Sequence, residues 1–214
     1  MNKKLFEIIS SKYQLQEIDM GDYKTLNKKG MHFLFSCYEL KDVGHISIFS
    51  MKAMFGAMKM ESIVINPFKK DAPLFSYDLI DVFGKRTLLV ENYNTQLANI
   101  SLKSLATFKE KYSSLEDGEA EHRWYDSLKM EGSLVKKGKK KNPLFEKMME
   151  EYMSAYLEIL SSSKDCDEEK KRSKAKEYTE GLLSHGGPAV DQIKKLIGEE
   201  RTGVLFREYI FGTK

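Results

Sequence analysis

The chain has 214 residues, of which 41% are hydrophobic and 31% are charged, and its formal net charge is +3. This balance is that of a folded protein rather than a disordered one, and the length favours one domain over residues 1–214 with a sizeable core. No apolar run reaches the roughly 18 residues that a membrane-spanning helix needs, and the amino-terminal segment lacks the pattern of a signal peptide, so we expect a cytoplasmic protein with no membrane partner.

The first half of the chain predicts a short helix followed by a run of strands. Leu5, Ile8 and Ile9 recur at helical spacing within residues 3–12. Further on, short runs rich in β-branched and aromatic residues alternate with Gly and Pro breaks, which is typical of adjacent strands. These runs cover residues 31–38, 45–51, 58–65, 74–80 and 87–91. Because their connections are too short for crossover helices, we expect a mainly antiparallel sheet.

The second half of the chain predicts helices and one more strand. Apolar residues take up a helical period from Ser101, and a brief strand at 132–136 leads into a basic turn at 136–141. Pro143 begins a helix with one apolar face, and Asp167 is predicted as the N-cap of the next. Strands followed by helices, with a helix at the start, predict an α+β fold: a three-layer α/β/α sandwich with a central, mainly antiparallel sheet flanked by helices.

Asp78 is the residue whose placement most suggests chemistry. It lies inside an apolar strand, where a carboxylate either faces solvent or points into the core and must be hydrogen-bonded or keep its proton. Glu61 and Ser62 lie on the preceding strand, and the strand register decides which of them shares its face. A like-charged neighbour pushes one carboxylate toward protonation, which supplies a general acid near neutral pH.

The other polar and sulfur-containing residues have simpler structural interpretations. The four histidines and two cysteines show no ligand spacing, so we expect no metal site and no disulfide framework. His185, in a loop that opens a helix, stays a candidate because histidine moves protons at neutral pH. The basic run at 136–141 is typical of a solvated loop, and runs of this kind also bind acidic partners. Four methionines are interpreted as core packing: Met51, Met54, Met58 and Met60.

No nucleotide-binding loop and no hydrolase elbow occurs in the sequence, so the electrons for any redox chemistry come from a separate carrier. Several weaker motifs follow one another in a recognisable order. Pro73-Leu74-Phe75-Ser76-Tyr77-Asp78-Leu79 resembles the aspartate-containing strand of the ferredoxin-dependent bilin reductases and of their relative, red chlorophyll catabolite reductase. The family's later motifs are similar to Trp124, Gly132-Ser133-Leu134-Val135-Lys136-Lys137, the tyrosine-rich helix at 152–160, Pro188-Ala189 and Ile210-Phe211.

This resemblance, which covers residues 45–212, implies a site as well as a fold. It implies that an open-chain tetrapyrrole lies between the sheet and the carboxy-terminal helices, and that Asp78 is the central proton donor. Family members use no flavin or metal and take single electrons from ferredoxin. The chain is therefore expected to be an oxidoreductase for a biliverdin-like linear tetrapyrrole, with no bound cofactor and an acidic ferredoxin-type electron donor. Residues implied to contact the substrate are Phe75, Tyr77, Gly187 and, as partners of the propionates, Lys136 and Lys137.

The chain departs from the family pattern at two places. Where the family often has His or Asn on the strand before the aspartate, this chain has Ser62 beside Glu61. Many members also have an aspartate directly before the Pro-Ala pair, where this chain has Gly187. His185, two residues upstream, is the hypothesised substitute in a second protonation. Two alternatives stay open: a non-catalytic tetrapyrrole-binding or carrier protein of the same fold, and an interaction module whose basic run binds an acidic partner or, as a weaker expectation, nucleic acid.

Overall fold

The computed structural model describes residues 3–119 and 122–214, and its centre is one nine-stranded sheet. The spatial order is β1-β3-β4-β5-β6-β7-β9-β8, with β2 also paired to β3, and every paired strand is antiparallel. The strands are β1 (Leu15–Ile18), β2 (Thr25–Lys28), β3 (Met31–Leu40), β4 (Gly44–Ala53), β5 (Met58–Pro67), β6 (Leu74–Val82), β7 (Lys85–Tyr93), β8 (Glu116–Asp117) and β9 (Leu134–Lys139).

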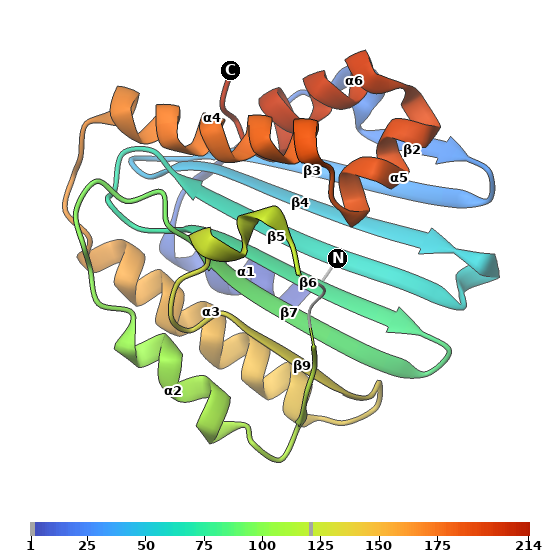
Figure 1. Ribbon diagram of the computed structural model, residues 1–214, viewed down its shortest axis with the longest axis horizontal. Coiled ribbons are helices and arrows are strands. Elements are labelled where there is room, and N and C mark those ends of the chain that lie inside the picture. Colours follow the sequence, from blue (N-terminus) through green and yellow to red (C-terminus); the bar gives the residue numbers. More distant parts are fainter. Residues whose placement is uncertain (1–2, 120–121) are drawn as a thin grey trace.

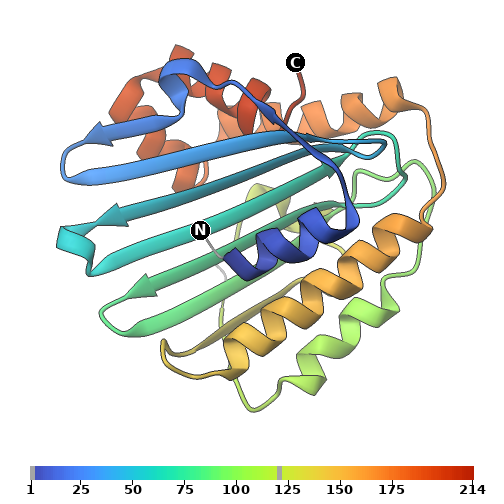
Figure 2. The ribbon, with the colours of Figure 1, turned by 180° about the vertical axis from the view of Figure 1, so that it is seen from behind.

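Helices cover both faces of this sheet (Figures 1 and 2). One face carries α1 (Lys3–Lys12), α2 (Lys103–Lys111) and α3 (Leu144–Ser162). The other carries α4 (Glu168–His185), α5 (Pro188–Ile197), α6 (Glu199–Val204) and the π-helix η4 (Leu205–Ile210). Short 3-10 turns are η1 (Gly21–Tyr23), η2 (Met54–Gly56) and η3 (Trp124–Leu128). The predicted α+β sandwich of three layers is therefore confirmed. None of the described helices combines the length and the hydropathy needed to cross a bilayer.

Local signals explain most of the element boundaries. The Asp167 side chain accepts a hydrogen bond from the Lys170 backbone N–H at 3.1 Å, which confirms it as the N-cap of α4.

The predicted basic turn is partly wrong, because β9 continues to Lys139 by pairing with Lys85–Val90 on β7. Two short strands, β1 and β2, lie between α1 and β3, where the sequence pattern predicted no strand, and both pair with β3. Tertiary pairing thus extends the sheet beyond what the local pattern showed.

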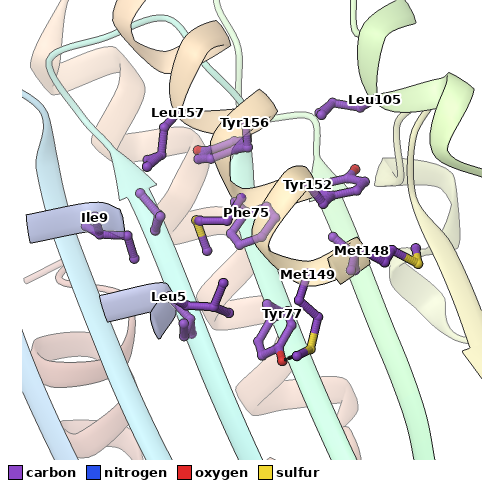
Figure 3. Packing of buried hydrophobic residues seen from close by; sticks show 14 of the residues in the cluster. Leu5, Ile9, Phe75, Tyr77, Leu105, Met148, Met149, Tyr152, Tyr156 and Leu157 are labelled. Atoms are coloured by element: carbon purple, nitrogen blue, oxygen red, sulfur yellow. Dashed lines mark hydrogen bonds between the residues drawn. The ribbon is translucent and has the colours of Figure 1, made fainter. Parts of the chain in front are cut away.

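Two separate cores hold the layers together. Figure 3 shows the core under α3, where Phe75 of β6 stacks on Tyr156 with ring centroids 4.5 Å apart. On the opposite face, polar side chains of β4 and β5 fix the carboxy-terminal segment. Ser47 and Asn66 donate hydrogen bonds of 2.9 and 2.7 Å to the carbonyls of Ile210 and Phe211. Because these bonds are buried, they hold the last turn of the chain firmly over the sheet.

We predict that replacing Phe75 destabilises the fold, because its ring is 1% exposed and packed between α3 side chains. Phe75→Ala should lower the free energy of unfolding by about 3–5 kcal/mol, as measured by urea denaturation. Phe83→Ala is the matched control, since that ring is 70% exposed, and it should change the value by less than about 0.5 kcal/mol. Equal effects of the two substitutions would contradict this packing.

Candidate functional site

The register of three central strands decides which residues surround Asp78. Asp78 on β6 lies directly opposite Ser62 on β5 and Leu89 on β7. Residues directly opposite each other point to the same face of a sheet, so Ser62 shares the face of Asp78. Glu61 pairs with Leu79 and lies on the other face. The question that the sequence left open is thus settled in favour of Ser62.

The Asp78 carboxyl lies in a water-poor setting. Part of the side chain remains accessible, yet the protein around it desolvates the carboxyl and raises its pKa to about 7. A hydrogen bond from the Ser62 hydroxyl acts in the opposite direction, and the charge of Glu91 raises the pKa further. Near neutral pH, both the acid and the carboxylate of Asp78 are therefore populated, which is the condition for a general acid.

Glu91 is the second carboxyl on this face and is held by its own partners. It lies opposite Ser76 on β6, diagonal to Asp78. The Lys129 ammonium is 2.7 Å from one of its oxygens, and the Tyr93 hydroxyl donates a 2.6 Å hydrogen bond to the other. Glu91 therefore contributes a fixed, compensated negative charge beside Asp78.

Aromatic side chains close the site on the side of η3 and α4. Tyr178 of α4 stacks on Tyr93 with centroids 4.5 Å apart, and Trp124 and Tyr125 of η3 meet edge to face at 5.5 Å. Burial raises the pKa of Tyr125, and the charges of Glu91 and Asp78 raise it further. These rings exclude water from the side of Asp78 that faces the carboxy-terminal helices.

A cavity of about 1150 Å³ lies on the Asp78 face, between strands β3 to β6 and helix α5. Its volume exceeds the roughly 300–1,000 Å³ of common small-molecule sites. Ile80 lines it and lies two residues along β6 from Asp78, about 7 Å between the Cα atoms. Asp78 itself does not line the cavity, but it lies on the same face of β6, two residues from the cavity wall.

The cavity wall combines sulfur-containing and aromatic side chains with cations. It includes Met31, Met51, Met54, Met58, Met60, Phe33, Phe49 and Phe55. The interpretation as core packing is confirmed for Met51, Met58 and Met60, which belong to the core of this face or pack against it and also line the cavity. It is wrong for Met54, which is 53% exposed. The cations are Lys29, Lys52, Arg123 and Lys195. Sequence reasoning missed them because they come from four separate segments.

Two of the residues implied to contact the substrate lie on the opposite face. Phe75 and Tyr77 are buried in the α3 core, where the Tyr77 hydroxyl donates to the Met149 sulfur (Figure 3). Their side chains cannot reach the cavity through the sheet, so this expectation is corrected. The strand alternation carried the signal, since residues 75 and 77 have the opposite parity to Asp78.

The implied propionate partners are also not at the cavity. Lys136 is fully buried on the α2 face, where its ammonium pairs with Asp117 at 2.8 Å and donates to the Leu115 carbonyl at 3.2 Å. This expectation too is corrected, because the pairing with Leu88 turns Lys136 away from Asp78. Lys137 pairs with Thr87 and so shares the Asp78 face, but it does not line the cavity.

His185 and Gly187 lie where α4 ends and α5 begins, next to the helix that borders the cavity. The His185 ring is exposed at the end of α4, 5.4 Å from the ring of Trp124. Gly187 is the N-cap of α5, whose residues Ala189 and Asp191 line the cavity. Neither His185 nor Gly187 lines the cavity itself. Within the described ranges, no three His, Cys, Asp or Glu side chains are grouped so as to hold a metal ion.

Comparison with known proteins adds a structural relative. No protein-family model and no curated protein sequence matches the chain. The chain is similar in fold to phytochromobilin synthase from tomato. The likeness is to a crystal structure of that protein, as its selenomethionine form in complex with biliverdin, with a TM-score of 0.71. The match covers 100% of this chain and 83% of that one at 14% identity, so what it shows is a shared fold.

We predict that Asp78 makes stability fall as pH rises from the unfolded pKa of 3.8 to the folded pKa of about 7 and then level off. The folded chain keeps this proton up to a pKa of about 7, whereas the unfolded chain releases it near 3.8. The contribution is therefore fully present below the unfolded value and lost as pH rises through the folded one. Urea unfolding of the natural chain and of Asp78→Asn, compared from acid to slightly alkaline pH, should show the natural chain losing stability relative to the variant. Parallel pH profiles would show that Asp78 ionises normally.

Proposed function

We propose that this protein is an oxidoreductase that reduces a biliverdin-like linear tetrapyrrole, with Asp78 as the proton donor. The observation that carries this proposal is a carboxyl with a pKa of about 7 that lies two residues along β6 from the wall of a large cavity. A general acid of this pKa is matched to proton transfer near neutral pH. The fold likeness to a protein crystallised with biliverdin supports the choice of ligand class.

The cavity wall suits such a ligand. The methionine and phenylalanine side chains offer an adaptable apolar surface for linked pyrrole rings. Lys29 and Lys195 border the same cavity and are suited to pair with the two carboxylates of a biliverdin-like molecule. We propose these cations in the role that was first expected of Lys136.

The proton chemistry follows from the state of Asp78. Protonated Asp78 donates a hydrogen bond to a pyrrole or lactam group of the bound ligand. When an electron reaches the ligand its basicity rises, Asp78 transfers its proton, and the resulting carboxylate regains a proton from solvent. Reducing one double bond takes two electrons and two protons, so a second proton must reach the ligand, either from reprotonated Asp78 or from a second donor. We retain His185 as the candidate for that step, to be tested by the product formed by His185→Ala.

The electrons come from outside the site, because the side chains around Asp78 move protons rather than electrons. We propose an external one-electron carrier of the acidic ferredoxin type, with no cofactor bound to the chain itself. A second candidate function is a non-catalytic tetrapyrrole carrier. Gly187, in place of the aspartate that the family resemblance implies, is the observation that favours it.

We predict that Asp78→Asn abolishes most of the turnover while ligand binding persists, since the amide keeps the shape and loses the transferable proton. Anaerobic incubation with reduced ferredoxin and biliverdin, followed by absorbance spectra, should show a rate lowered by about 10²-fold or more. Glu61→Gln is the matched control, because Glu61 lies on the opposite face, and it should react normally.

The same experiment separates the two candidate functions. A natural chain that binds biliverdin and leaves its spectrum otherwise unchanged under reducing conditions is the carrier. Unimpaired product formation by Asp78→Asn removes Asp78 from the mechanism.

We predict that Lys195→Met weakens binding of biliverdin by about tenfold, the loss expected for one charge-assisted contact. Affinity is measured by titration of absorbance with biliverdin and with its dimethyl ester. The substitution should leave the affinity for the ester unchanged, because the ester has no carboxylate. A parallel loss for both compounds would indicate that Lys195 only shapes the cavity.

A further inference from the structure

Two neighbouring turns carry exposed aromatic side chains at one end of the sheet. The β4–β5 turn holds Met54 and Phe55, which are 53% and 113% exposed, and the β6–β7 turn holds Phe83, which is 70% exposed. The turns touch, since the Phe83 N–H donates to the Ala57 carbonyl at 3.1 Å. Figures 1 and 2 show both hairpins ending at the same edge of the molecule. Both rings are therefore exposed on adjoining turns at one edge of the molecule.

The backbone makes these positions doubly unfavourable for large apolar residues. Phe55 and Phe83 have φ angles of 52° and 47°, in the left-handed region that bulky L residues avoid. Glycine or asparagine forms such turns at lower cost. In the isolated chain these phenylalanines have unfavourable backbone angles and exposed rings. We infer that their favourable contact is with a surface outside the chain.

The surroundings of the two turns are positively charged. Lys52 and Lys59 flank the first turn, Lys85 follows the second, and Lys139 pairs with Lys85 across β7 and β9. Asp81 directly precedes the second turn and lies opposite Lys59, but it is 8% exposed and forms ion pairs with Arg86 and Lys140. Among the described residues, none of these four lysines is joined to a carboxylate by an ion pair. Exposed aromatic side chains bordered by these unpaired lysines are complementary to an anionic, partly apolar surface.

We propose that the turns of Phe55 and Phe83 insert into the surface of a membrane with anionic lipids, while the flanking lysines contact the headgroups. Aromatic side chains favour this interfacial depth, and lysines near an anionic leaflet add electrostatic attraction. Because the two turns touch at one edge of the molecule, both rings can enter a headgroup layer together. The contact needs no spanning segment, and it revises the expectation that no membrane takes part.

The proposed contact also determines where the cavity lies relative to the membrane surface. Met54, Phe55 and Lys52 line the cavity as well as forming the turn. The cavity therefore lies directly behind the inserted turn. The inference does not depend on the reaction carried out in the cavity, because it rests only on the exposure, backbone and charge of this edge.

Vesicle sedimentation tests the proposal. The natural chain should bind to vesicles of equal parts phosphatidylcholine and phosphatidylserine. It should bind far less to vesicles of phosphatidylcholine alone. Phe55→Ser combined with Phe83→Ser should weaken binding by about tenfold or more, since two buried rings are lost. Leu34→Ser is the matched control, because Leu34 is 51% exposed but lies on β3 away from the turns, and it should bind normally.

The electrostatic part has its own variant. Lys85→Gln combined with Lys139→Gln should weaken binding to the anionic vesicles and leave the weak binding to neutral vesicles unchanged. Added salt should likewise weaken binding to the anionic vesicles. Absent vesicle binding overturns the proposal, as does binding that the paired Phe variant leaves intact. Binding of an acidic protein at these turns, without vesicle binding, overturns it in favour of a protein interface. Thermal unfolding of each variant confirms that the fold is retained.

Discussion

The site depends on one physical constraint, the desolvation of a carboxyl on the inner face of a sheet. A carboxylate with little water around it is costly, so Asp78 keeps its proton to a higher pH than usual. The neighbouring strands hold this arrangement in place: Ser62 bonds to the carboxyl from one side, and Glu91 adds its charge from the other. On the same face, Ser47 and Asn66 hold the last turn of the chain against the sheet through buried hydrogen bonds. Scaffold and chemistry therefore use the same face of the sheet.

Much of the fold could be predicted because its signals are local. Period-two runs broken by Gly and Pro gave the meander from β3 to β7, and one apolar stripe gave α3. Strand register is not local, so the choice between Glu61 and Ser62 needed the structure. For Phe75 and Tyr77 a local signal existed, because strand alternation places both side chains on the face of β6 opposite to Asp78. The expectation that they contact the substrate came from the family resemblance and did not use this signal.

The charges of the site could not be found from runs in the sequence. Lys136 sits in the most basic segment of the chain, yet its ammonium is buried against Asp117. Lys29, Lys52 and Lys195 line the cavity although they are far apart in sequence. Folding brings them together from a β-turn, a hairpin and helix α5, and no spacing rule connects such segments. The exposure of Phe55 could likewise not be predicted from the sequence, because it depends on the conformation of the turn.

The central claim is that the Asp78 carboxyl, next to the cavity wall on β6, holds a proton near neutral pH. Infrared difference spectra between the natural chain and Asp78→Asn, recorded over a pH series, measure this directly through the carbonyl band of a protonated carboxylic acid. The account predicts a band that disappears with a midpoint near the pKa of about 7. A band that is already lost near pH 4 would show that Asp78 is an ordinary solvated carboxylate and would contradict the account.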